Sequence, residues 1–167
     1  WERDSQFVRE TLPGRLDLRY GPDPRQRVDL YPVPGSERLL VFLHGGYWRG
    51  LDKRMFAWLA PAWVAEGVSV ALVNYRLCPA VGIADIVDDA IAALNWIAIH
   101  APVHGTGAER IVVAGHSAGG HLVGAIFAAA RECFAFDLVR IAGGVPISGL
   151  FDFSPMAQDK AQIWIEK

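Results

Sequence analysis

Cysteine is scarce in this chain, which limits the kinds of site that it can form. Cys78 and Cys133 are the only two cysteines among 167 residues, and they lie in apolar surroundings without C-x-x-C spacing. This pattern favours buried free thiols over a disulfide or a metal-binding pair. Free thiols are typical of a reducing compartment, so we expect a cytoplasmic protein.

Charge of one sign and long apolar runs are also lacking. The 16 Lys and Arg residues nearly balance the 18 Asp and Glu residues, for a formal net charge of -2. The charges form no basic patch and no acidic tail, which argues against a nucleic-acid partner. No run approaches the ~20 apolar residues of a membrane span, and no secretory signal pattern opens the chain. We therefore expect no membrane partner.

Apolar residues are plentiful, at 52% of the sequence. A chain of this length and composition can bury the core of one compact domain, so we expect residues 1–167 to form a single domain or part of one. Residues 1–14 are polar and mixed and end in a Pro-Gly pair, so a surface arm is expected there.

Hydrophobic periodicity predicts an alternation of strands and helices. Alternating patterns at 16–20 and 28–30 predict a hairpin of two half-exposed strands, and continuous apolar runs predict buried strands at 39–43, 68–73, 111–114 and 138–147. Helical spacing of apolar residues marks the segments 55–66, 83–97 and 122–127. In the first of these, Pro61 marks either a kink or a first-turn position. Three carboxylates early in the second, Asp85, Asp88 and Asp89, are expected on a solvated helix face.

This order of elements predicts an α/β fold. Alternating strands and helices form a mostly parallel sheet with helices on both faces, a three-layer sandwich. Ligands bind such sheets at the carboxyl ends of the strands. Functional residues are therefore expected where strands end.

The run 111–120 (IVVAGHSAGG) is the most informative of these strand ends. It reads as a buried strand that enters a helix through a G-x-S-x-G turn, in which the central serine adopts a strained backbone conformation. Side chains at the flanking positions would collide, and Gly115 and Gly119 provide none. Ser117 is therefore the candidate nucleophile, and the backbone N–H of Ala118 is a candidate oxyanion donor.

A second informative strand end is the segment 44–48 (HGGYW), directly after a predicted buried strand. Gly45 and Gly46 let the backbone approach a ligand closely, so they and Tyr47 are candidates for the other half of an oxyanion hole. His44 is favoured as a hydrogen-bonding brace over a general base because it precedes the glycines. Tyr47 and Trp48 are candidate contacts to an aromatic substrate.

Together with the turn 74–77 (NYRL), these two motifs resemble esterases of the α/β-hydrolase superfamily. The H-G-G-x-W form of the loop resembles the kynurenine formamidase (arylformamidase) family, over about residues 16–154. The resemblance implies Ser117 as nucleophile, with Gly45, Gly46 or Tyr47 and Ala118 as oxyanion donors. It also implies hydrolysis of an N-formyl anilide, a small-molecule substrate, without cofactor or metal.

One part of the superfamily pattern is missing. The triad order is serine, then acid, then histidine, but the only histidine after Ser117 is His121, one helical turn later and poorly placed as a base. Asp152 is the best-placed carboxylate, ahead of Asp137 and Asp159. The histidines before Ser117 are no better, since His116 points away from it and His100 and His104 lie at the amino end of a strand.

The end of the chain departs from the family as well. The resemblance fades after Pro155, and residues 156–167 form an atypical tail, so we expect a sheet truncated on its C-terminal side. Such a sheet has an open apolar edge, which a missing segment or a partner would cover; a homodimer is one such arrangement.

Two function classes follow from the sequence. The favoured one is a serine hydrolase that cleaves an aryl formamide or a small carboxylic ester through an acyl-enzyme. The alternative is an inactive hydrolase fold that serves as a binding module, and the missing base motivates it.

Overall fold

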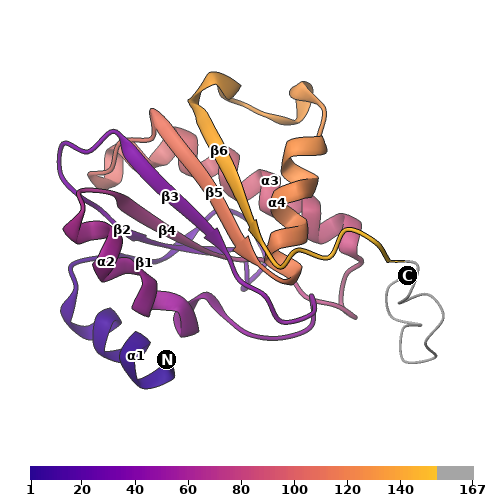
Figure 1. The fold of residues 1–167 in the computed structure, drawn as a ribbon, viewed down its shortest axis with the longest axis horizontal. Helices are drawn as coiled ribbons and strands as arrows, with labels where there is room; N and C mark the ends of the chain where they lie inside the picture. Colours follow the sequence, from indigo (N-terminus) through magenta and orange to yellow (C-terminus); the bar gives the residue numbers. More distant parts are fainter. Residues whose placement is uncertain (154–167) are drawn as a thin grey trace.

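Six strands form one sheet within residues 1–153, the part of the chain that this computed structural model describes (Figure 1). They are β1 (Arg15–Arg19), β2 (Arg27–Tyr31), β3 (Arg38–Leu43), β4 (Ser69–Asn74), β5 (Arg110–His116) and β6 (Ile141–Ile147). Their order across the sheet is β1-β2-β4-β3-β5-β6. The β1/β2 and β2/β4 pairs are antiparallel and the other three are parallel, so the predicted mostly parallel fold is confirmed. The predicted tail 156–167 lies outside the described residues.

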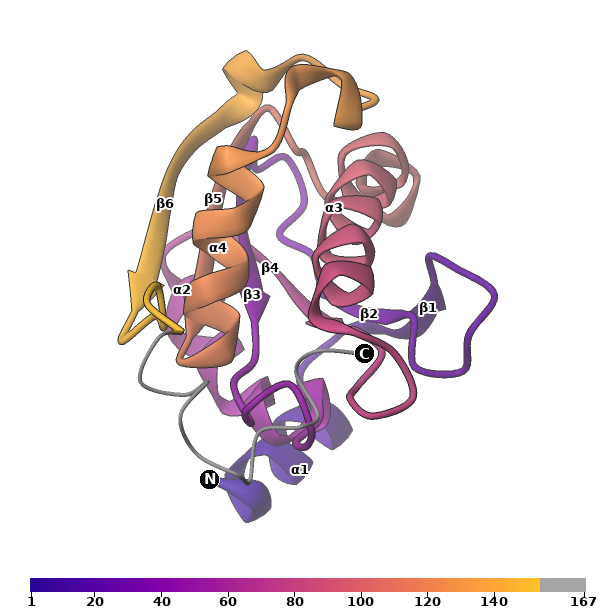
Figure 2. The ribbon, with the colours of Figure 1, turned by 90° about the vertical axis from the view of Figure 1, so that its right-hand side faces the viewer.

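Helices cover both faces of the sheet, as the alternation predicts (Figures 1 and 2). One face packs against α1 (Glu2–Thr11), the 3-10 helix η1 (Lys53–Leu59) and α2 (Ala60–Ala65). The other face packs against α3 (Ile83–His100) and α4 (Ala118–Ala128). Three further 3-10 helices are η2 (Ala101–His104), η3 (Arg131–Cys133) and η4 (Leu138–Arg140).

The apolar run of β3 explains why this strand is central. Leu39, Val41 and Leu43 join the core beneath α3 and α4, whereas Leu40 and Phe42 join the core beneath η1 and α2. Because successive side chains of a strand point to opposite faces, a strand covered on both sides needs an uninterrupted apolar run. The sequence pattern therefore places β3 correctly in the interior.

The helical segment after β3 has clear local signals. Asp52 caps η1 by accepting a hydrogen bond from the Arg54 N–H, at 2.9 Å. Pro61 lies in the first turn of α2, so the first-turn alternative holds, and the backbone turns at Gly67 with φ +72°.

Two N-terminal segments differ from expectation. The expected surface arm forms helix α1, whose Ser5 and Val8 are buried against the fold. The hairpin is present, but only β1 is half-exposed. Strand β2 is buried because β1 and β4 flank it and the side chains on both of its faces are covered.

Three further expectations need correction. Asp89 is not on a solvated face: it is 2% exposed and accepts hydrogen bonds from Arg76 and Gln26. Cys133 is an exposed free thiol, whereas Cys78 is buried. The last predicted inner strand begins only at Ile141 and lies at the edge of the sheet among the described residues. Tertiary packing decides the burial of Asp89, the exposure of Cys133 and the edge position of β6.

The helical stretch Ile83–His104 is long and apolar enough to cross a membrane, judged by length and composition alone. Half of its most apolar window is buried inside the fold, where α3 contributes Ile86, Leu94 and Ile97 to the core. A core helix meets the same criteria, so this property is weak evidence for a membrane span.

Candidate functional site

The turn between β5 and α4 has the geometry that the sequence predicts. Ser117 lies between the last residue of β5, His116, and the first residue of α4, Ala118. Its backbone has φ 55° and ψ -115°, a conformation that side-chain-bearing residues rarely adopt. The Ser117 N–H donates to the Ile147 carbonyl of β6 at 2.8 Å, which fixes the turn. The residue is half-buried, so its side chain is not sealed beneath the sheet.

Glycine is required on both sides of Ser117 by close backbone contacts. A Cβ atom at Gly115 would lie 2.3 Å from the Gly119 carbonyl oxygen. A Cβ atom at Gly119 would lie 2.0 Å from the Leu43 carbonyl oxygen. Both distances are far below van der Waals contact, so the glycine spacing allows the turn to pack against the end of β3.

The glycine loop after β3 lies directly beside this turn. A Cβ atom at Gly45 would be 3.3 Å from the Ser117 Cβ and 2.9 Å from the His116 carbonyl oxygen. The structure thus brings Gly45 beside Ser117. Gly46 and Tyr47 follow Gly45 in the same loop, and Ala118 is the first residue of α4. The first N–H groups of a helix have no partner within the helix and favour negative charge.

Hydrogen bonds within the loop set the direction of its peptide groups. The Gly46 carbonyl accepts from the N–H groups of Arg49 and Gly50, each at 3.0 Å. Gly46 has φ +109°, and Tyr47 and Trp48 each have φ +56°. Three successive residues with positive φ make a tight loop, and a side chain at Gly46 would collide with the Gly50 carbonyl at 2.3 Å.

His44 is a buried brace for this loop. It is completely buried, and its Nδ1 lies 2.7 Å from the Gly45 carbonyl oxygen. A carbonyl can only accept, so Nδ1 carries the proton in this bond. Burial lowers the pKa of His44 to about 4, so the ring is neutral at pH 7. These features agree with the brace and not with a general base.

The two predicted aromatic contacts have different environments. The Tyr47 side chain is 47% exposed, so it is accessible to a ligand. Trp48 is 1% exposed and packs edge-on against His121, at 5.3 Å between ring centroids, and against Phe153, at 5.6 Å. Within the described residues, Trp48 is therefore part of the hydrophobic core and not an exposed contact for a ligand.

Among the described residues, no histidine side chain is hydrogen-bonded to the Ser117 hydroxyl; the His121 backbone N–H donates to the Ser117 carbonyl at 3.0 Å, as a bond within α4. His116 is exposed, and His121 is enclosed by Trp48 and Phe153, where burial lowers its pKa. His100 and His104 stack on Trp96, and both precede the amino end of β5.

The three predicted carboxylates lie in different parts of the chain. Asp137 caps η4 by accepting from the Val139 N–H, at 3.1 Å. Asp152 lies close after β6, and Asp159 lies outside the described residues. Within residues 1–153, no three His, Cys, Asp or Glu side chains gather as metal ligands.

Sequence reasoning missed several buried polar residues, of which one supports the glycine loop. Tyr75, directly after β4, donates its hydroxyl hydrogen to the His44 carbonyl oxygen at 2.5 Å. The position of Tyr75 at the carboxyl end of a buried strand was the available signal. Asp29 and Lys53 form a buried ion pair at 2.6 Å, and neither position carried a signal in the sequence.

The chain matches a known protein family over most of its length. The family described as alpha/beta hydrolase fold matches residues 40–165, which include the loop 44–48 and the turn at Ser117. The chain belongs to this family. In an alpha/beta hydrolase, the glycine loop and the serine turn are both expected at the carboxyl ends of strands, as they are here.

Proteins similar to this alpha/beta hydrolase include two kynurenine formamidases and a protein of solved structure. Kynurenine formamidase of Drosophila melanogaster is 37% identical over 112 residues, covering 65% of this chain and 36% of the relative. Kynurenine formamidase of Danio rerio is 29% identical over 157 residues, covering 91% of this chain and 50% of the relative.

The solved structure is a proposed thioesterase from Silicibacter sp. It superimposes with a TM-score of 0.84 at 34% identity and covers 100% of this chain and 62% of that one. The alpha/beta hydrolase chain thus spans half or less of the length of these two formamidases and under two thirds of the solved structure.

Proposed function

We propose that this chain carries the nucleophile and the oxyanion donors of a serine hydrolase that acts on an aryl formamide or a small ester. The observation that carries the proposal is the contact between the loop 44–48 and the strained turn at Ser117. The attacking hydroxyl and the oxyanion donors must lie close together, because both act on the same acyl group. The similarity to kynurenine formamidases supports the formamide as substrate.

The proposed reaction proceeds through an acyl-enzyme. The Ser117 Oγ attacks the acyl carbon, and its proton passes to a base. The N–H of Ala118 and N–H groups of Gly45, Gly46 or Tyr47 stabilise the negative oxygen of the tetrahedral intermediate. The C–N or C–O bond then breaks, the amine or alcohol leaves with a proton, and water hydrolyses the acyl-enzyme. Exposed Tyr47 is the proposed contact to an aromatic leaving group.

The choice between formamide and ester is made by substrate comparison. We expect the rate with N-formylkynurenine, expressed as kcat/KM, to exceed the rate with p-nitrophenyl acetate. The opposite order would favour a general carboxylesterase. The similarity to a proposed thioesterase, which would also cleave an ester-type bond, supports testing this alternative.

The Ser117→Ala variant tests the nucleophile. We expect loss of hydrolysis by at least about 10³-fold and loss of fluorophosphonate labelling, because the variant lacks the hydroxyl that is proposed to attack the acyl carbon. The control is Ser36→Ala, which removes a hydroxyl in the loop before β3 that bonds the Gly67 carbonyl at 2.7 Å. The control is expected to keep the parent's rate of hydrolysis and its labelling by the fluorophosphonate.

The alternative function, an inactive fold used for binding, makes the opposite prediction. The described residues place no histidine side chain in hydrogen-bond contact with the Ser117 hydroxyl, and this observation favours the alternative. If the 167-residue chain is folded but is neither labelled nor active on either substrate, the serine hydrolase proposal fails for this chain. Labelling of a longer product of the same gene would then identify this chain as an inactive part of an enzyme.

A further inference from the structure

The brace residue His44 is itself held by a tyrosine from the neighbouring strand. Tyr75 is completely buried, and its ring stacks on the His44 ring with centroids 4.4 Å apart and an interplanar angle of 14°. Its hydroxyl donates to the His44 carbonyl oxygen at 2.5 Å. On the other side, Phe56 of η1 stacks on the same ring at 6.1 Å. His44 therefore has a single packed orientation.

These contacts fix the two peptide groups that carry the N–H groups of Gly45 and Gly46. In a planar trans peptide, the N–H points opposite to the C=O. The His44 carbonyl faces the Tyr75 hydroxyl, so the Gly45 N–H points away from Tyr75. The Gly45 carbonyl faces the His44 ring, so the Gly46 N–H points away from that ring. The hydroxyl and the imidazole thus determine the direction of both N–H groups.

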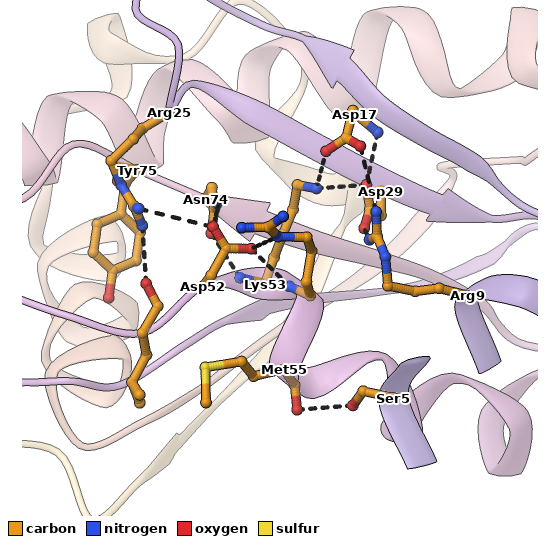
Figure 3. Close-up of polar contacts among 12 residues, drawn as sticks. Ser5, Arg9, Asp17, Arg25, Asp29, Asp52, Lys53, Met55, Asn74 and Tyr75 are labelled. Carbon is orange, nitrogen blue, oxygen red and sulfur yellow. Dashed lines mark hydrogen bonds and ion pairs between the residues drawn. The ribbon is translucent and has the colours of Figure 1, made fainter. Parts of the chain in front are cut away.

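A second layer of contacts holds Tyr75 in place. Arg25, in the connection between β1 and β2, donates from Nε to the Tyr75 carbonyl at 2.9 Å and from Nη2 to the Leu51 carbonyl at 3.1 Å (Figure 3). In addition, the Cys78 N–H donates to the Trp48 carbonyl at 2.8 Å. These bonds therefore join the segment after β4 to the segment after β3 at two points, through Arg25 to Leu51 and directly to Trp48.

We propose that Tyr75 is a positioning residue for hydrolysis, which orients the N–H groups of Gly45 and Gly46 through His44, and that Arg25 supports it. This inference rests on the proposed function, because the oriented groups are its oxyanion donors. Tyr75 does not touch the substrate. Its effect is on the transition state, where the donors must meet the developing negative charge.

The chain provides a matched control in Tyr31. Tyr31 is also buried, at 1% exposure, but it lies on β2 in the core beneath η1 and α2. Its hydroxyl has no hydrogen-bond partner among the described residues. Tyr75→Phe and Tyr31→Phe therefore remove the same atom from buried phenols, and only the first removes a bond to the loop.

Kinetics of these two variants test the proposal. Removing a whole oxyanion donor costs ~10²–10³ in turnover, so a misaligned donor is expected to lower kcat by roughly tenfold to a hundredfold in Tyr75→Phe. KM is expected to stay within about twofold of the parent value, since ground-state binding is retained. Tyr31→Phe is expected to leave both constants within about twofold. Equal kcat values for Tyr75→Phe and the parent would overturn the proposal.

A second variant and a second readout keep the test decisive. Arg25→Lys keeps the charge but cannot bridge two carbonyls in the same way, so a smaller loss of kcat at unchanged KM is expected even if Tyr75→Phe does not fold. Amide NMR shifts of Gly45 and Gly46 are expected to move in Tyr75→Phe and to stay in Tyr31→Phe. If the parent chain is inactive, the proposed function fails, and unchanged shifts in Tyr75→Phe would independently refute the orienting role.

Discussion

At the scale of single residues, the neutral His44 is the side chain that most directly links burial to the proposed chemistry. Burial lowers its pKa to about 4, because the charged imidazolium would lose its hydration in the core. A protonated ring would carry hydrogens on both nitrogens, and its Nε2 is buried without a partner among the described residues. The buried site therefore favours the neutral ring, in which Nδ1 donates to the Gly45 carbonyl.

The pH dependence of His44 has a definite sign. Its folded pKa lies below the ordinary 6.5, so its contribution to stability is fully present above pH 6.5 and is lost as the pH falls toward about 4. In that window the unfolding free energy falls by up to about 1.4 kcal/mol per pH unit from this residue. An NMR titration is expected to show no shift of the His44 ring signals between pH 8 and 5. A midpoint near 6.5 would contradict the buried, neutral state.

At the scale of secondary-structure elements, α1 is joined to the sheet and to η1 by buried polar contacts. Arg9 of α1 pairs with Asp29 of β2 and with Asp17 of β1, and Lys53 of η1 pairs with the same two carboxylates at 2.6 Å each (Figure 3). Two positive and two negative groups thus balance where four elements meet. Leaving one buried charge without its partner costs about 3–5 kcal/mol, so the cluster specifies how α1 docks.

Ser5 offers a direct test of this docking. Its hydroxyl donates to the Met55 carbonyl at 2.8 Å and accepts from the Trp58 N–H at 3.1 Å. Ser5→Ala leaves both groups of η1 without this partner, so a loss of about 1–3 kcal/mol in unfolding free energy is expected from urea denaturation. The control is Thr11→Ala, whose exposed hydroxyl bonds only within α1, to Phe7. Equal losses in the two variants would argue against the docking role.

At the scale of the whole molecule, β6 is one of the two edge strands of the described sheet, and its outer edge is unpaired. No strand within residues 1–153 pairs with that edge, and β6 presents Val145 at 47% exposure and Ile147 at 46%. An unpaired apolar edge strand is a template for pairing with another chain. The chain also spans only part of the length of its relatives.

Self-association through this edge is therefore expected for the 167-residue chain. Val145→Lys is expected to lower this self-association, because a lysine on an edge strand opposes pairing with another strand. The measurement is the concentration dependence of the sedimentation coefficient. Val103→Lys is the control, since Val103 on η2 is 80% exposed and the added charge is the same. Similar effects of both variants would assign the change to net charge and not to the edge.

The sequence by itself determined the order of the main strands and helices after residue 14, the central place of β3 and the required glycines around Ser117. These features depend on local periodicity and on backbone conformations that only certain residues tolerate, so neighbours in the sequence suffice to predict them. The role of Ser117 and of its predicted oxyanion donors stays a prediction.

Only the tertiary structure decided that α1 docks, that Asp29, Lys53 and Asp89 are buried, and that Tyr75 reaches the His44 carbonyl. It also decided that β6 lies at the edge of the described sheet. The physical reason is that each of these states depends on partners distant in the sequence. Burying a charged or hydrogen-bonding side chain costs free energy, and the cost is offset where folding places a complementary group beside it.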